Sequence, residues 1–457
     1  MKPFPLFCCI MRVLLTLISA TIIVSATAQT NAEKWDLRKC VEYAVKNNIS
    51  VKQADVQARL SALQMKQAKM FQYPTASFNT NLGPQFGRSI DPTTNIFTNT
   101  ELFAQSYGVQ GGIQVFNWGR IKNNIAAAEF SAKAALVDVE KVTNDISLNV
   151  ATFYLQVLAS KEQMNIASVQ IAQTKSQLEI TRKRVEAGAL PELNAIELEA
   201  RLANDSSNYI NAQSTFQQNV LTLKGVLNVD AALPFEVETP SIEKIPLETL
   251  ADLQPESVFQ MALNNLPTQK SNLLKVKAAE KNILVNKATL YPTISSNYSL
   301  GTTYNNKDVN FITGVKTPYF DQINRNFRQN LGIGVSVPIF NSGQNRINYE
   351  QSKLNLTSAK VQEEQDNQKL KQDIYTAYNN VINATQKFNA SKKSVESSQK
   401  AYDFALKRYE VGLLNTLDLI TNQNNLLTAK LQLIANQFDY VFRMKLLEFY
   451  KGNGMKL

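Results

Sequence analysis

The stretch that decides the fold is Phe116-Asn117-Trp118-Gly119-Arg120, which recurs in the second half of the chain as Phe340-Asn341-Ser342-Gly343-Gln344. A second pair has the same spacing, since Arg184-Val185-Glu186-Ala187-Gly188 recurs as Arg408-Tyr409-Glu410-Val411-Gly412. The segments between the paired stretches have therefore kept the same length. Such spacing indicates an internal duplication, which has to be recognised before any single segment is assigned.

Each copy of the duplication is predicted to form a helix, two strands, a long helix and a further helix. We assign residues 29–227 to the first repeat and residues 256–457 to the second. Residues 228–255 carry four prolines and are predicted to form an ordered linker that crosses the outside of the helices.

The opening helices are predicted at residues 37–71 and 256–290. They end at Tyr73-Pro74-Thr75 and Tyr291-Pro292-Thr293, because the residue before a proline is disfavoured in the helical conformation. Each motif is followed by a change of hydrophobic period from 3.6 to 2, which predicts strands.

The strand patterns are clearest in the second repeat. Hydrophobic residues alternate with small or polar ones at residues 294–302 and 331–337, and a similar pattern occupies residues 107–115. Polar loops are predicted at residues 88–105 and 305–330. One apolar and one polar face would suit a half-buried sheet on a soluble core, or a barrel wall with lipid outside and water inside. Four short strands cannot close a barrel, so this pattern alone leaves both alternatives open.

The long helices are predicted at residues 119–187 and 343–411, two ranges of equal length that are free of proline. At ~1.5 Å per residue, each would be about 100 Å long. The following helices, near residues 191–227 and 415–450, together with the opening helices match this length when placed end to end. We therefore expect each long helix to lie beside two stacked shorter ones. Its apolar or small residues step alternately by four and three, as in coiled coils.

The amino terminus is predicted to be a secretory signal peptide, residues 1–28. Lys2 and Arg12 accompany an apolar run from Val13 to Ser25, which is too short to span a bilayer as a helix. Cys40 is then the only cysteine of the mature chain, and we expect it to be a small buried residue rather than a reactive thiol.

Composition argues against several classes of function. The chain has no histidine, which excludes histidine-based catalysis and histidine metal ligands. No phosphate-binding glycine motif is present, so no cofactor is predicted, and an enzyme is not expected. The net charge is +10, but basic and acidic residues are interspersed. A nucleic-acid partner is therefore not predicted.

The duplicated layout, the Tyr-Pro-Thr and Phe-Asn-x-Gly motifs and the Arg-x-Glu-x-Gly turns resemble those of the TolC-like outer-membrane efflux proteins. The resemblance implies a mainly α fold with a β-barrel part. In a homotrimer, a 12-stranded outer-membrane barrel would continue into a 12-helix periplasmic α-barrel. It also implies a passive exit duct for an efflux or type I secretion system, with an inner-membrane pump and a periplasmic adaptor as partners.

The resemblance further implies roles for the two turns that follow the long helices. Such turns form the periplasmic tip, where the candidate adaptor-contact residues are Gly188, Ala189, Leu190, Gly412, Leu413 and Leu414. An acidic ring often narrows the tunnel nearby, and the candidate gate residues are Asp418, Glu197, Asn194 and Thr421. The alternative is that these residues only build the turns and complement the helix dipole.

Two other classes of function compete with the duct. A non-conducting periplasmic coiled-coil adaptor or scaffold would share the long helices, but it gives no reason for strands at matched points in both repeats. An extracellular enzyme lacks any clustered catalytic residues. The transported substrate is not predictable from the sequence. The aromatic residues around the strands are compatible with a membrane-interface belt or with packing between sheet and helices. They are Phe116, Trp118, Phe340, Tyr73 and Tyr291.

Overall fold

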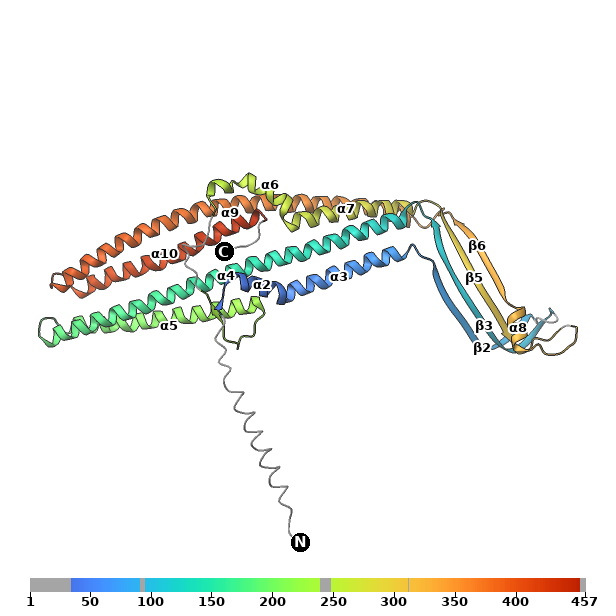
Figure 1. The fold of residues 1–457 in the computed structure, drawn as a ribbon, viewed down its shortest axis with the longest axis horizontal. Coiled ribbons are helices and arrows are strands. Elements are labelled where there is room, and N and C mark those ends of the chain that lie inside the picture. Colours follow the sequence, from blue (N-terminus) through green and yellow to red (C-terminus); the bar gives the residue numbers. More distant parts are fainter. Residues whose placement is uncertain (1–33, 91–94, 239–247, 311, 453–457) are drawn as a thin grey trace, which may run out of the picture.

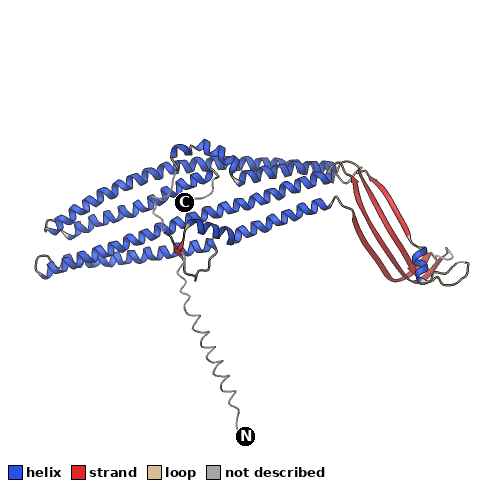
Figure 2. Cartoon of the chain, viewed as in Figure 1, coloured by secondary structure: helices blue, strands red, loops and turns tan. Residues whose placement is uncertain are grey.

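The computed structural model describes residues 34–90, 95–238, 248–310 and 312–452, and the predicted signal peptide lies outside them. The molecule is elongated. Helices run side by side along most of its length, and a sheet extends from one end at an angle to them (Figure 1). Helical and sheet parts are segregated rather than layered on each other (Figure 2).

The two long helices are α4 (Arg120–Glu186) and α9 (Gln344–Glu410), with 67 residues each. Both match the predicted ranges to within one residue at each end. Each follows two residues with positive φ, namely Trp118 and Gly119 in the first repeat and Ser342 and Gly343 in the second. Because the left-handed conformation favours glycine, the repeated Phe-Asn-x-Gly motif marks the turn from strand to helix.

The predicted opening helices are each broken in two, so the expectation of continuous helices was wrong. The first repeat has α2 (Leu37–Asn47) and α3 (Ile49–Met70), and the second has α6 (Pro255–Asn265) and α7 (Pro267–Ala288). The two breaks lie at Asn48 and Leu266, which are both extended. Asn48 caps α3 by accepting from the amide of Ser50, and Leu266 precedes Pro267, which disfavours a helical conformation there.

The helices that follow the long ones are α5 (Leu193–Leu227) and α10 (Thr416–Tyr450), of 35 residues each. Pro191 was expected as the first residue of a helix, but α5 begins two residues later. On one side of α4, helices α3 and α5 lie end to end, and on the other side α7 and α10 do the same (Figure 1). Since α9 also contacts α7 and α10, the expected stacking of short helices beside long ones is confirmed.

The predicted seam of α9 is largely buried within the single chain. Several of its residues are alanine or serine, which lets neighbouring helices approach closely. The buried members are Leu370, Ile374, Ala377, Val381, Ala384, Ser391, Tyr402, Ala405 and Tyr409.

A hydrophobic cluster holds the middle of the helical part together, where α2, α4 and α5 meet. Tyr154 is buried there, and its hydroxyl donates to the carbonyl oxygen of Glu238 at 2.8 Å. Cys40 is fully buried in this cluster as expected, and burial raises the pKa of its thiol to about 12.

Part of the linker is ordered against the same cluster. Its strand β4 (Glu236–Val237) pairs in parallel with β1 (Lys34–Trp35), and the sequence did not predict this pair of short strands. A single 3-10 turn, η3 (Leu250–Leu253), follows, while residues 239–247 of the predicted linker lie outside the described residues.

The sheet is antiparallel, with the order β2-β3-β5-β6. Its strands are β2 (Thr75–Ile90), β3 (Phe97–Phe116), β5 (Thr293–Asn305) and β6 (Arg328–Ser336). The central β3–β5 ladder joins the two repeats. The predicted loop at residues 88–105 was wrong over most of its length, because β2 and β3 extend into it and pair as far as Ile90 and Phe97.

The other predicted loop, residues 305–330, contains the short helix α8 (Tyr319–Arg325) before β6 begins. Gln322 of α8 is fully buried and bonds to the backbone of Asn305 at the end of β5. Its Oε1 accepts from the amide of Asn305, and its Nε2 donates to the carbonyl of the same residue, both at 3.0 Å. These two bonds therefore occupy the backbone N–H and C=O groups of Asn305, at the edge of β5 that β6 does not reach.

At Gly111 the backbone of the neighbouring strand lies so close that we expect no larger residue to be tolerated there. A Cβ on Gly111 would lie 1.9 Å from the carbonyl oxygen of Thr75, whereas one on Gly108 of the same strand would meet nothing closer than 3.7 Å. We expect Gly111→Ala to destabilise the sheet by ~1–3 kcal/mol, because the paired backbone has to shift.

The measurement is thermal unfolding of the sheet, followed by circular dichroism in detergent, with Gly108→Ala as the control. Equal melting temperatures for the two variants would contradict the close approach.

Candidate functional site

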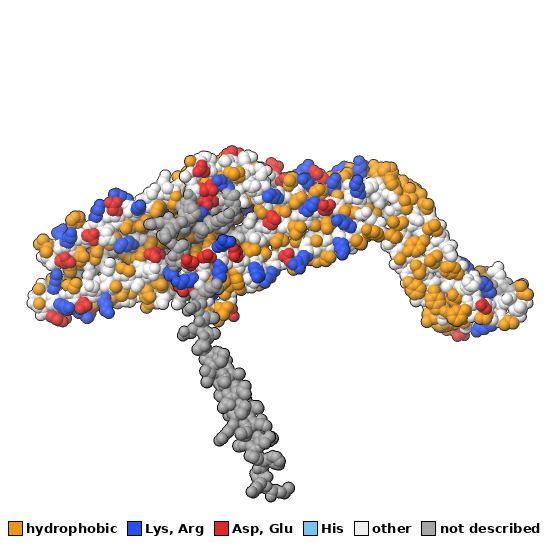
Figure 3. Space-filling view, viewed as in Figure 1, with side chains coloured by type: hydrophobic (Ala, Val, Ile, Leu, Met, Phe, Trp, Pro, Cys, Tyr) orange, Lys and Arg blue, Asp and Glu red, His pale blue; other side chains and the backbone are white. Residues whose placement is uncertain are grey.

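The two faces of the sheet differ sharply in chemistry. One face carries large hydrophobic side chains that are exposed in the single chain, among them Phe78, Leu82, Leu331, Ile333 and Val335. Leu331 and Ile333 are 79% and 77% exposed. Hydrophobic side chains cover much of the visible sheet surface (Figure 3). An apolar patch of this kind needs a partner or a lipid environment.

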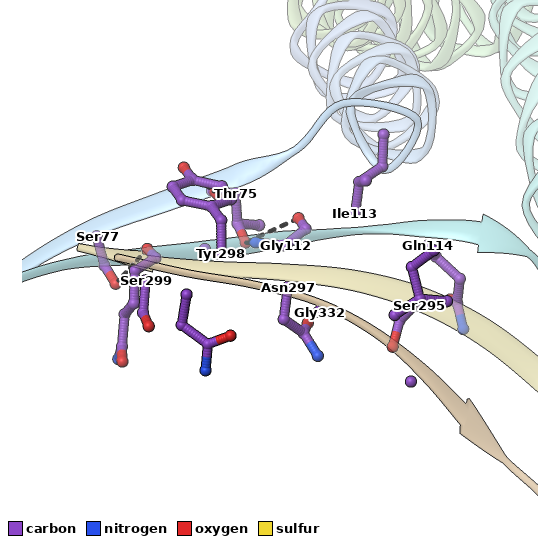
Figure 4. Close-up of a pocket in the computed structure, with 15 residues that line it drawn as sticks. Thr75, Ser77, Gly112, Ile113, Gln114, Ser295, Asn297, Tyr298, Ser299 and Gly332 are labelled. Carbon is purple, nitrogen blue, oxygen red and sulfur yellow. Dashed lines mark hydrogen bonds between the residues drawn. The ribbon is translucent and has the colours of Figure 1, made fainter. Parts of the chain in front are cut away.

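The opposite face is polar and hollowed. Ser77, Gln110, Ser299 and Asn330 form one row across the four strands, since each lies opposite the next in the ladders. Neighbouring rows contribute further small or amide side chains around a hollow of about 780 Å³. In Figure 4, Ser77, Asn297 and Ser295 extend to this side of the sheet, while Tyr298 and Ile113 extend to the other.

The sheet has two open edges in the described part of the chain, because β2 and β6 each pair on one side only. Unpaired strand edges are rare inside membranes and tend to recruit another strand in water. The combination of an exposed apolar face, a polar hollow and free edges favours pairing of the two edges with further strands.

Aromatic residues gather where the sheet meets the helices. The indole nitrogen of Trp118 donates to the carbonyl of Pro292 at 2.8 Å, and its ring lies 5.0 Å from that of Tyr291. Phe340 remains 86% exposed. Trp118 and Tyr291 therefore pack at the junction, whereas the side chain of Phe340 is exposed to its surroundings in the single chain.

The two turns at the far end of the helices have the same geometry. Gly188 and Gly412 have φ of 72° and 78°. The amide of the residue after each glycine donates to the carbonyl five residues back, from Ala189 to Arg184 and from Leu413 to Arg408, both at 2.8 Å. This is the Schellman ending of a helix, which explains why the Arg-x-Glu-x-Gly motif recurs.

The predicted tip residues differ in exposure. Ala189 is exposed and Leu413 is 70% exposed, whereas Leu190 is half-buried. Leu414 packs against the buried cluster that contains Tyr409. Other exposed apolar residues lie beside the turns and were not predicted from the sequence. They are Val411, Leu417, Leu193 and Ile196.

The predicted gate residues lie on the first two turns of α5 and α10. Asp418 and Thr421 are exposed, and Glu197 and Asn194 are half-buried. The two first turns are neighbours, because Ile420 of α10 packs against the cluster formed by Ala195 and Leu198 of α5. No ion pair engages Asp418 or Glu197 in the part of the chain that the structure describes.

The beginning of α10 is capped as the sequence predicts. Asn415 is extended, and its side-chain oxygen accepts from the amide of Asp418 at 2.8 Å. The first turn of α5 has no such side-chain cap at Glu192. The first turns of α5 and α10 therefore differ in their capping.

Polar contacts inside the helical part connect the two repeats near the tip. The Thr181 and Tyr409 hydroxyls lie 3.0 Å apart, and Gln177 donates to the hydroxyl of Tyr402 at 3.1 Å. Both contacts join α4 to α9. The heptad pattern identified the two tyrosines as seam residues, but the pairing partners on α4 could not be found without the structure.

A buried acid extends this polar layer. Asp205 of α5 is 2% exposed, and it accepts from Thr174 at 2.7 Å and lies 3.0 Å from Arg201. Gln423 of α10 in turn donates to Thr174 at 3.4 Å. Buried charges are tolerated when they are paired and hydrogen-bonded in this way.

Other types of site find no support among the described residues. No group of three or more cysteine or acidic side chains there is placed to hold a metal ion. Within the same ranges, no helix is long and apolar enough to cross a bilayer.

Comparisons with known proteins agree with this geometry. The family profile "Outer membrane efflux protein" matches residues 41–229 and 258–446, one match in each repeat. The outer membrane efflux protein BepC of Brucella suis is 23% identical over 430 residues, which cover 93% of this chain and 87% of BepC. The outer membrane protein TolC of Escherichia coli is 23% identical over 318 residues, covering 67% of this chain and 62% of TolC.

Solved structures share the fold at lower identity. The CusC structure superposes with a TM-score of 0.79 at 18% identity, covering 93% of this chain and 94% of CusC. The outer membrane protein VceC of Vibrio cholerae gives a TM-score of 0.77 at 15% identity, covering 92% and 97%.

The cap of α10 yields a prediction about the rigidity of its first turn. Asn415→Ala removes the bond to the Asp418 amide and should cost ~1 kcal/mol, as losses of such caps do. Hydrogen exchange of the backbone amides at residues 416–419 should then become faster.

Asn422→Ala is the matched control, because Asn422 bonds to a carbonyl within the same helix and alanine favours helix interiors. Unchanged exchange in Asn415→Ala would show that the cap does not stabilise this turn.

Proposed function

This chain belongs to the outer membrane efflux protein family, and we propose that it is the exit duct of a tripartite efflux or type I secretion system. The observation that carries the proposal is the sheet, with lipid-compatible side chains on one face and a polar hollow on the other. Membrane barrels filled with water have this division.

The proposed assembly is a homotrimer. Three sheets would pair β6 of one copy with β2 of the next, giving a closed barrel of 12 strands in the outer membrane without free edges. The helices would continue as a 12-helix barrel in the periplasm. Each proposed repeat then has one strand pair and one long helix. The repeats are residues 29–227 and 256–457, with residues 228–255 between them.

The proposed mechanism is passive. A continuous water-filled path lowers the barrier to crossing the outer membrane, while an inner-membrane pump and a periplasmic adaptor supply energy and substrate. Such a path requires no covalent chemistry and no cofactor. The non-conducting scaffold remains the alternative, but a scaffold gives no reason for a sheet with one apolar and one polar face.

We propose that the turns after α4 and α9 contact the adaptor. Gly188 and Gly412 shape them, and Ala189 and Leu413 expose apolar surface there, while the half-buried Leu190 and Leu414 support the turns. The exposed Leu417 extends the same surface.

We propose in addition that Asp418 lines a periplasmic gate, with Glu197, Asn194 and Thr421 near it. Three Asp418 carboxylates brought together by threefold symmetry would favour cations. The exposure of Asp418 and its lack of an ion partner among the described residues support this role.

The duct and its gate are tested together by planar-bilayer recordings of the purified mature protein. We expect cation-selective channels whose selectivity weakens in Asp418→Asn, because the ring loses its charge. Asp252→Asn in the linker turn is the control, as it removes the same charge away from the tip. Channels that Asp418→Asn leaves unchanged would retain the duct and reject the gate.

The tip surface is tested by co-purification with the periplasmic adaptor that assembles with the wild-type protein in its host. Leu413→Ser should weaken this association about ten-fold, the effect of losing ~1.4 kcal/mol at an interface. Leu354→Ser is a close control, since Leu354 on α9 is 69% exposed against 70% for Leu413. Equal retention of the adaptor by both variants would exclude Leu413 from the contact.

A further inference from the structure

Charge is almost absent from the polar face of the sheet. Strand alternation and the ladder register assign the described side chains to this face, and serine, threonine, asparagine, glutamine and glycine predominate there. Of the acidic and basic residues in the four strands, Arg88 and Glu101 fall on the opposite, apolar face by the same alternation. Arg328 is the one charged residue on the polar face among the described side chains.

Arg328 occupies an open position on that face. It lies opposite Gly301, which lies opposite Gly108, which in turn lies opposite Asn79. The two glycines leave the middle of this row without side chains. The guanidinium group is exposed, and the described residues place no ion pair or hydrogen bond on it.

Arg328 is also the first residue of β6, at the end of that strand remote from the helices (Figure 1). The β3–β5 ladder continues for four pairs beyond its row, to Ala104 and Asn305, and β2 and β3 extend farther still.

Two acids occur in the segment between β5 and β6. Asp308 is paired with Arg325, and Asp321 of α8 forms no ion pair with Arg328 among the described residues. No charged residue on the polar face of the four strands therefore compensates the positive charge of Arg328.

We propose that Arg328 forms a cationic ring in the outward part of the duct, which attracts the anionic groups of solutes as they leave. The proposal rests on the proposed trimeric barrel, in which the polar face lines the water-filled path. Threefold symmetry then places three guanidinium groups around one opening. Rings of arginine favour anions in pores, and guanidinium binds carboxylate and phosphate groups with two parallel hydrogen bonds.

The ring would give the duct opposite charges in its helical and sheet parts. The proposed acidic gate lies at the helical tip, whereas the arginine ring lies within the otherwise uncharged polar face of the sheet. Arg328 is accordingly a selectivity residue for carboxylate- or phosphate-bearing cargo. A competing role is that this charge merely discourages wrong pairing at the edge of β6.

Two measurements on the purified full-length mature trimer test the ring. The first is the reversal potential in a potassium chloride gradient for wild type, Arg328→Gln and Arg88→Gln. Arg88 is the control, because it carries the same charge on the same sheet, farther from the helices along β2 and on the apolar face. We expect Arg328→Gln to lower the anion-to-cation permeability ratio by about two-fold or more, since charged clefts carry potentials of at least about kT.

Arg88→Gln should leave the ratio unchanged, and Arg328→Lys should retain most of it. At ~1 M salt the difference should nearly vanish, because the Debye length falls to ~3 Å. Equal permeability ratios for Arg328→Gln and Arg88→Gln at low salt would overturn the proposal. It would also be overturned if Arg328→Gln changed only the yield of trimer, since that result would assign Arg328 a structural role at the edge of β6.

The second measurement does not require the periplasmic tip of the duct to be open to ions. Binding of inorganic pyrophosphate to the trimer is followed by calorimetry, and we expect Arg328→Gln to weaken it several-fold while Arg88→Gln does not. Wild-type trimers that conduct no ions but bind pyrophosphate through Arg328 would retain the ring and contradict the open duct. Conducting trimers in which neither measurement depends on Arg328 would retain the duct and reject the ring.

Discussion

The constraint on which the rest of the structure depends is the hydrogen bonding of the two outer strands. A strand edge has to be paired before it can enter a bilayer, and β2 and β6 each have one unpaired side in the described chain. The apolar face adds a second demand, because Leu331 and Ile333 are more than three-quarters exposed in the single chain. One copy of the sheet cannot meet either demand alone. The proposed trimer meets both, and the helical part has to follow the same symmetry.

In the helical part, the lengths of neighbouring helices have to match. Two helices of the same length, α4 and α9, alternate with pairs of shorter helices, so a wall forms only if each pair spans its long neighbour. The break at Asn48 follows α2, which packs in the hydrophobic cluster around Tyr154, whereas Leu266 is buried in a second cluster with Ile374 and Leu447. Polar contacts such as Thr181 with Tyr409 join the repeats farther along, where small side chains leave little hydrophobic area.

Most of the architecture could be predicted because it is repeated. The spacing between Gly119 and Gly343 located both long helices, and strand alternation separated the two faces of the sheet. Features without a period were missed. The ladder between β1 and β4 is two residues long, and polar residues around position 98 disguised the extension of β3. At the tip, composition identified Leu413 as exposed apolar surface, but Leu414 faces inward because the turn rotates its side chain toward the cluster with Tyr409.

The buried amide of Gln322 has a practical consequence for engineering. Besides bonding to both backbone groups of Asn305, it donates to the carbonyl of Thr317, so it ties the end of β5 to the segment just before α8. The hairpin closed by the bridge between Val309 and Lys316 lies before this anchor and outside the strand ladders. In the proposed barrel, foreign peptides inserted at the turn around Gly314 would lengthen this hairpin rather than a strand of the sheet, which makes the turn a natural position for displaying an epitope on the side of the membrane away from the helices.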